Sequence, residues 1–137
     1  NKFCVLNCKG KGNIPTFIKI LNEFESKGIA LHDADDPVLS DGKKNPMWTI
    51  NSKILEECKQ GNFRIYPIVH NKDFESYYLN EHIPYDKPYN IYHHLMSSDF
   101  KTNPQYAKLN SLVPNLTANN HPNQYRTKEE FEKIVGL

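Results

Sequence analysis

The stretch Ile29-Ala30-Leu31-His32-Asp33-Ala34-Asp35-Asp36-Pro37 is an apolar run that ends in three carboxylates and a proline. This pattern predicts a buried β-strand that delivers its last residues to a sheet edge, where a loop begins. Side chains two residues apart on a strand point the same way, so Asp33 and Asp35 are expected to present both carboxylates to one point. Like charges this close repel unless a cation lies between them, usually a divalent ion with oxygen ligands. The stretch therefore predicts a Mg²⁺ or Mn²⁺ site, with an ordinary acidic turn as the alternative.

The composition sets limits on the class of protein. With 137 residues, the chain can bury a core without disulfides. Its 17 Lys and Arg against 16 Asp and Glu give a net charge of +1, which excludes a broad basic field, so any nucleic-acid contact is expected to be local. The three cysteines lack the spacing of zinc ligands or of a redox motif, so we expect them to be reduced, cytoplasmic cysteines with packing roles.

Membrane and secretion segments are not expected. No apolar stretch has the length of a membrane span, and the start lacks the apolar core of a signal peptide. Because the first residue is Asn1 rather than Met, we expect a fragment of a longer protein.

A strand, a helix and a second strand are expected in the first part of the chain. Phe3-Cys4-Val5-Leu6 is prone to form a strand, and the turn Gly10-Lys11-Gly12-Asn13 introduces a helix that Lys27-Gly28 closes. Apolar residues recur on one face of that helix, at Ile14, Phe17, Ile18, Leu21 and Phe24. With the strand that ends at Asp33, this order predicts a parallel pair of strands joined by a helical crossover.

The middle of the chain adds a helix and a strand. A helix is expected from about Thr49 to Gln60, closed by Gly61, and Phe63 to Val69 is expected as a third strand. Pro67 removes one backbone donor and places its position near a sheet edge or a strand end. Asp73 is the expected N-cap of a short helix.

Helices alone are expected after that strand. Asp86-Lys87-Pro88 breaks the chain, and helices are expected at Tyr89 to Met96 and Gln105 to Leu112, before a loop from Pro114 to Pro122. Thr127-Lys128-Glu129-Glu130 forms a capping box that starts a last helix through Val135.

The predicted fold is an α/β domain with a small, mainly parallel sheet flanked by helices and followed by a helical C-terminal extension. The expected boundaries are 1–98 for the α/β domain and 99–137 for the extension. Functional groups collect at the carboxyl ends of parallel strands, which places Glu75, after the third strand, near Asp33 and Asp35 as a further oxygen ligand. The alternative for Glu75 is a first-turn acid that favours the helix dipole. Lys87 is a candidate to contact a phosphate, or an ordinary exposed lysine.

The order of these motifs resembles the Toprim nuclease domain of the overcoming-lysogenisation-defect (OLD) family, which includes the nuclease subunit of Gabija anti-phage systems. The similarity covers roughly Phe3 to Leu95. The residues that carry it are Gly10-Lys11-Gly12-Asn13, His32-Asp33-Ala34-Asp35, Trp48-Thr49-Ile50-Asn51 with Ile54, Asp73-Phe74-Glu75 and Asp86-Lys87-Pro88.

The resemblance implies a Toprim-like, Rossmann-like fold and a DNA endonuclease or nickase that depends on Mg²⁺ or Mn²⁺. By position, Asp33, Asp35 and Glu75 would be metal ligands, and Glu75 and Lys87 the catalytic groups, with Lys87 stabilising charge on the scissile phosphate. The implied partners are DNA, an ABC-type ATPase domain in cis or in trans, and a second copy in a homodimer. ATP would bind only to the ATPase domain. The implied setting is cytoplasmic anti-phage defence.

Two positions depart from the family pattern. The family's first strand ends in a glutamate before the glycine, with a second acid four residues on, and Lys9 and Asn13 stand there in this chain. A protonated Lys9 cannot ligate a metal ion and would repel it. The explanations that remain open are a degenerate domain, a deliberately altered sequence, or an ammonium group that replaces one metal ion in a one-metal site. The alternative function is therefore a catalytically silent module that serves as a DNA- or protein-binding scaffold.

Overall fold

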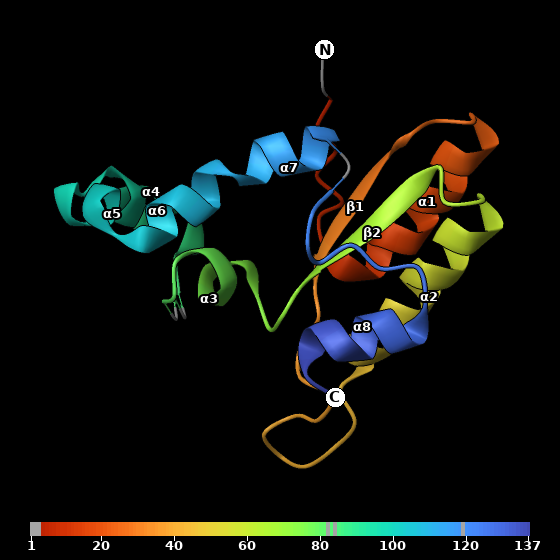
Figure 1. Cartoon of the computed structure of the whole chain (residues 1–137). Coiled ribbons are helices and arrows are strands. Elements are labelled where there is room, and N and C mark those ends of the chain that lie inside the picture. Colours follow the sequence, from red (N-terminus) through yellow and green to blue (C-terminus); the bar gives the residue numbers. More distant parts are fainter. Residues whose placement is uncertain (1–3, 82, 84, 119) are drawn as a thin grey trace.

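A computed structural model shows a small parallel sheet flanked by helices, with a second group of helices to one side (Figure 1). It describes residues 4–81, 83, 85–118 and 120–137, without the side chains of Lys87, Pro88 and Thr117. Within these residues, no helix has the length and apolar character needed to cross a membrane.

The sheet consists of β1 (Gly28–Asp33) and β2 (Ile65–His70), which pair in parallel from Gly28↔Ile65 to Asp33↔His70. The predicted α/β class and the small parallel sheet are confirmed, but the parallel pair joins the second and third expected strands rather than the first and second. The expected strand at the start of the chain is wrong for residues 4–6, and Phe3 lies outside the described residues. Val5 is 90% exposed, so this segment gains too little burial to offset the entropy lost on ordering its backbone.

A segment near the end of the chain covers the other edge of β2. Ile68 forms an isolated antiparallel bridge with Gln124, and the Val69 N–H donates to the Asn123 carbonyl over 3.2 Å. The Asn123 side chain donates back to the Val69 carbonyl over 2.9 Å. β2 thus lies between β1 and this antiparallel segment, which explains why five of its six residues are buried.

The helix α1 (Ile14–Glu23) follows the short 3₁₀ helix η1 (Lys11–Asn13). Pro15 lies in its first turn, where a missing N–H costs nothing. Its apolar face buries Ile14 and Ile18, as the periodicity predicts. The expected C-cap at Lys27-Gly28 is wrong, because the helix ends at Glu23 and Gly28 already belongs to β1.

The helix α2 (Pro46–Gln60) starts three residues earlier than predicted and ends at Gly61, as predicted. The Asn45 side chain caps it by accepting from the Met47 N–H, and Pro46 fits the first position. With α1 and the sheet it forms the first core cluster, whose buried members are Ile14, Ile18, Ala30, Ile54, Cys58 and Ile65.

We call the helices α3 to α7 the helical group. They are α3 (Phe74–Tyr78), α4 (Lys87–Met96), α5 (Ser98–Thr102), α6 (Pro104–Asn110) and α7 (Leu112–Ala118). In Figure 1, α4, α5 and α6 lie together at the left, away from the sheet. The predicted N-cap at Asp73 is confirmed, since its side chain accepts from the Ser76 N–H over 2.7 Å.

One prediction in the helical group is wrong: Pro114 to Pro122 was expected as loop, whereas α7 continues to Ala118. Pro114 fits because it lies in the first turn of α7, where its ring meets no preceding helical carbonyl. The buried core of the group, Tyr78, Leu79 and Phe100, lies on both sides of the predicted boundary at residue 98.

The last helix, α8 (Lys128–Val135), returns to the sheet and packs beside α2 (Figure 1). Its predicted capping box is confirmed: the Thr127 hydroxyl accepts from the Glu130 N–H, and the Glu130 side chain accepts from the Thr127 N–H. Phe131 packs edge to face against Trp48, with ring centroids 5.5 Å apart. Trp48 is therefore the packing anchor of this second core cluster, which also buries Ala34, Val69 and Tyr125.

Candidate functional site

Asp33 and Asp35 lie where β1 ends, beside the end of β2. The Ala34 N–H donates to the His70 carbonyl over 2.9 Å, and the Asp35 N–H donates to the Lys72 carbonyl over 3.2 Å. These bonds continue the sheet ladder for two residues beyond β1. Asp35 has a φ of 62°, in the left-handed region that few non-glycine residues adopt. The backbone therefore leaves the extended conformation at Asp35, so the two carboxylates do not lie on one straight strand as the sequence predicted.

Asp33 is paired with a buried histidine. His70 Nδ1 lies 3.3 Å from Asp33 Oδ1, and the two side chains are 2% and 41% exposed. Since the carboxylate accepts, His70 carries its proton on Nδ1 in this pair. Its ring stacks on Tyr77 and meets the edges of Phe74 and Tyr78, and among the described residues its Nε2 has no hydrogen-bond partner. The histidine thus fixes the carboxylate of Asp33 from inside the protein.

Asp35 is paired with Lys11. The Lys11 ammonium group donates to Asp35 Oδ2 over 2.7 Å and to the Ala34 carbonyl over 3.1 Å. The Lys11 side chain is only 11% exposed and that of Asp35 35%. Burial lowers the pKa of Lys11, whereas its hydrogen bond with Asp35 and the negative charges of Asp35 and Asp33 raise that pKa. The carboxylates thus oppose the loss of charge that burial alone would favour.

Sequence reasoning missed Lys11 and singled out Lys9 and Asn13 instead. Lys9 is exposed and has a φ of 57°. The Asn13 amide donates to the Cys8 carbonyl over 2.9 Å and so holds its own turn. The position of Lys11 between two glycines, in the turn before α1, is the sequence feature that could have found it, because that turn faces the end of β1 in a strand-helix-strand unit.

Glu75 lies in the first turn of α3 and is 6% exposed. Lys87 is the first residue of α4, and its side chain lies outside the described residues. Within the part of the chain that the structure describes, no three His, Cys, Asp or Glu side chains are placed to hold a metal ion. Asp33, Asp35 and Glu75 therefore do not form such a group in this structure.

The donor set does not fit a metal ion held by both Asp33 and Asp35. The ammonium group of Lys11 already lies against Asp35, and Asp33 accepts from His70. A metal ion bound by both carboxylates would have to displace the first contact and bring a second positive charge beside it, which is unfavourable at this distance.

The carbonyl of Ala34 connects the carboxyl end of β1 to α2. It accepts from Lys11 on one side and from the Asn51 side chain, over 2.9 Å, on the other. Asn51 is 4% exposed, and its Oδ1 has no hydrogen-bond partner among the described residues. The strand end is thus braced from two elements.

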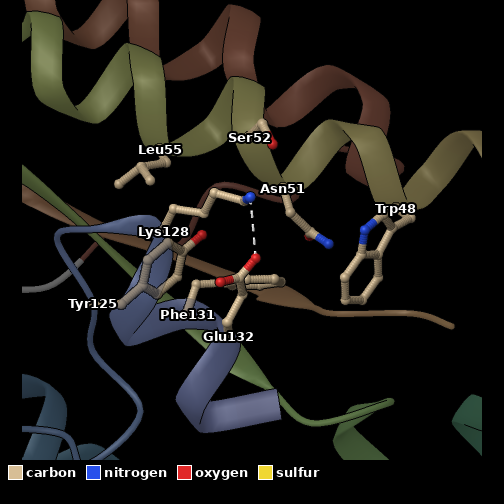
Figure 2. A pocket seen from close by; sticks show the side chains of 8 residues that line it. All are labelled: Trp48, Asn51, Ser52, Leu55, Tyr125, Lys128, Phe131 and Glu132. Atoms are coloured by element: carbon tan, nitrogen blue, oxygen red, sulfur yellow. Dashed lines mark ion pairs between the residues drawn. The ribbon is translucent and has the colours of Figure 1, made fainter. Parts of the chain in front are cut away.

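Asn51 also lines a cleft between α2 and α8. Figure 2 shows Trp48, Asn51, Ser52 and Leu55 on one wall and Tyr125, Lys128, Phe131 and Glu132 on the other, with Lys128 paired to Glu132. The cleft measures about 50 Å³. Because one water needs about 10–15 Å³ of such space, the cleft has room for only a few waters. It is therefore a packing gap of the second core cluster.

His32 lies in this core, where it is 5% exposed. Its Nδ1 donates to the Asp33 carbonyl over 3.1 Å, so its Nε2 accepts from the Tyr125 hydroxyl over 2.8 Å. Burial lowers the pKa of His32 to about 3. His32 is therefore neutral and is not a charged group of the site.

No family model, no curated protein and no solved structure matches this chain.

Proposed function

We propose that this chain is a Toprim-like module of the OLD type that binds DNA at the carboxyl edge of its sheet and does not cleave it alone. The observation that carries the proposal is the contact of Lys11 with Asp35. A cation supplied by the chain already neutralises one of the two carboxylates on which cleavage would depend.

The arrangement of the site supports the resemblance. Asp33 ends β1 and Asp35 follows it; β1 pairs in parallel with β2, and α2 connects the two strands. The carboxyl end of parallel strands is where α/β folds place their functional groups. The turn around Lys11 comes from the segment before α1 and reaches the same edge.

The donor set supports binding rather than cleavage. Lys9 and Asn13 stand where the family has acids, and the Asn13 amide is used within its own turn. Glu75 does not join the two aspartates in a group of three among the described residues. The three carboxylates that the resemblance implies for cleavage therefore do not form a metal-binding group among the described residues.

Three exposed lysines lie in the loops around this edge and would contact phosphates: Lys9, Lys44 and Lys72. The carbonyl of Lys72 accepts from the N–H of Asp35. Lys44 forms a bridge with Val38, and its neighbour Asn45 donates to the Asp36 carbonyl. The loops that carry Lys44 and Lys72 are thus hydrogen-bonded to the stretch around the aspartates. Lys9 lies in the turn that contains Lys11.

Binding of a labelled DNA duplex, followed by fluorescence anisotropy in EDTA over a range of salt, tests the proposal. Replacing Lys9, Lys44 and Lys72 by alanine should weaken binding about tenfold or more and reduce the salt slope by about three. The matched control replaces Lys19, Lys53 and Lys59, which are exposed on α1 and α2. Equal losses in the two triple variants, or no binding by the parent chain, would contradict the proposal.

The second candidate is the metal-dependent nickase, favoured by the 41% exposure of the Asp33 side chain at this edge. Supercoiled plasmid incubated with Mn²⁺ or Mg²⁺ distinguishes the two. Nicking by the parent chain that disappears in Asp35→Ala would replace the binding proposal with the nickase. Gain of nicking only in Lys9→Glu would support a module that lost its site. The assignments of Glu75 and Lys87 stay predictions, and Lys87→Ala should slow any nicking found.

An ABC-type ATPase partner, in cis or in trans, belongs to the same proposal, as do a homodimer and a cytoplasmic role in anti-phage defence. Because the ATPase would supply the only ATP site, ATP should leave DNA binding by this chain unchanged.

A further inference from the structure

We propose that the ammonium group of Lys11 is a built-in cation that takes the place of a divalent metal ion at Asp33 and Asp35. The edge of the sheet then keeps its shape without metal. This inference rests on the proposed function, because both assign the positive charge of the site to Lys11.

The contacts of Lys11 are those of a cation site rather than of a surface ion pair. Its Nζ has two oxygen partners, the Asp35 carboxylate at 2.7 Å and the Ala34 carbonyl at 3.1 Å, and the charge of Asp33 also acts on it. Exposed lysines seldom hold one geometry, because ordering their long side chains costs entropy. Lys11 is 11% exposed, so its position is set by packing.

The backbone that Lys11 contacts is one that needs support. Asp35 has a φ of 62°, and non-glycine residues keep such a conformation only where their surroundings enforce it. Here the Asp35 side chain is held by Lys11 and its N–H by the Lys72 carbonyl. Asn51 completes the support by donating to the carbonyl of Ala34.

The two partners of Lys11 come from the stretch that the resemblance assigns to metal binding, and Lys11 comes from a segment 24 residues away in sequence. A hard divalent ion prefers carboxylate and carbonyl oxygens, the same groups that Lys11 contacts. The ammonium group therefore satisfies the acceptors that such an ion would use. In Lys11→Met, a side chain of similar length without charge, these oxygens should become available to Mn²⁺.

The experiment measures Mn²⁺ binding from the loss of the free-ion signal in electron paramagnetic resonance. The parent chain should bind Mn²⁺ no tighter than about millimolar, and Lys11→Met about tenfold or more tighter. Lys44→Met, which removes an exposed lysine of the same edge, is the matched control and should behave as the parent. The double variant Lys11→Met with Asp35→Asn should lose the gained affinity.

Thermal melting gives a second readout. Lys11→Met should melt below the parent in EDTA and recover on addition of Mn²⁺, whereas the parent should not respond to Mn²⁺. If Lys11→Met is unfolded in EDTA, Mn²⁺ must restore its fold. No gain of Mn²⁺ affinity, no recovery, or tight binding by the parent would each overturn the inference. These measurements involve no DNA. If the chain fails to bind DNA while the Mn²⁺ results are as expected, only the DNA-binding proposal is contradicted and the inference about Lys11 stands.

Discussion

The sheet with α1, α2 and α8, here called the α/β layer, and the helical group are built in different ways. The first cluster of the layer buries aliphatic side chains such as Ile18, Ile54 and Ile65, on elements of six to fifteen residues. The helical group buries Tyr78, Leu79 and Phe100 under helices of five to ten residues. Helices this short are marginal alone and depend on their packing. The comparison indicates that the layer is the more stable region and that the helical group should unfold first.

The largest effect is expected in the layer. Ile54 is fully buried at the centre of the first cluster, and Ile54→Ala should lower the free energy of unfolding by about 2–5 kcal/mol, because it removes apolar contacts and leaves a cavity. Urea denaturation followed by circular dichroism measures the change. Ile20→Ala, at a position 48% exposed, is the control and should change little. A small loss for Ile54→Ala would mean that the layer is not the stable part of the molecule.

The next effect is a pH dependence in the second cluster. Burial lowers the pKa of His32 to about 3, from an ordinary value of 6.5, so the unfolded chain binds more protons between these values. The contribution of neutral His32 to the free energy of unfolding is therefore fully present above pH 6.5 and falls as the pH drops towards 3, by about 1.4 kcal/mol per pH unit. Because of this group, the free energies of unfolding measured by urea denaturation at pH 7 and pH 5 should differ by about 2 kcal/mol. In His32→Gln this contribution should be absent, and an unchanged pH slope would contradict the assignment.

A smaller effect is expected at the partner of His32. Tyr125→Phe removes the hydroxyl that donates to His32 Nε2 and leaves a buried acceptor unpaired, at a cost of about 1.5 kcal/mol. Tyr66→Phe is the control, since its hydroxyl accepts from the exposed Arg126. Equal losses in the two variants would show that the buried bond is no stronger than the exposed one.

The smallest effect tests whether the two regions unfold separately. Thr127→Ala removes the N-cap of α8, and Asn103→Ala removes that of α6, each at a cost of about 1 kcal/mol. Native-state hydrogen exchange should show faster exchange across α4 to α6 in Asn103→Ala and across α8 in Thr127→Ala. If both variants accelerate exchange everywhere by the same factor, the chain unfolds as one unit.

The fold could be predicted where burial and periodicity agree. The apolar face of α1, the end of α2 at Gly61 and the capping box of α8 are local patterns, and the structure confirms them. The strand expected at residues 4–6 failed because strand formation requires a neighbour that no local pattern can supply. The helix α7 was missed because Pro114 was interpreted as a loop signal, although the first turn of a helix tolerates it.

The candidate site was predicted only in part. Asp33 and Asp35 lie at the carboxyl end of β1, as expected. The partners that determine their chemistry, His70 and Lys11, come from elsewhere in the chain, and their contacts depend on tertiary structure. The position of Lys11 between two glycines indicates a turn at this end of the sheet, but only the tertiary structure shows that its ammonium group contacts Asp35.

The antiparallel segment along β2 has a consequence for the order in which the chain folds. It joins His32 to Tyr125 across 93 residues of sequence, so β2 stays open on one side until that late segment arrives. Contacts of such long sequence separation slow folding, because a large loop must close before they form. During synthesis, the Ile65–His70 strand would emerge well before its cover and would present an unpaired edge to other chains. Nascent chains that stop short of Tyr125 should therefore aggregate, whereas those that include it should not.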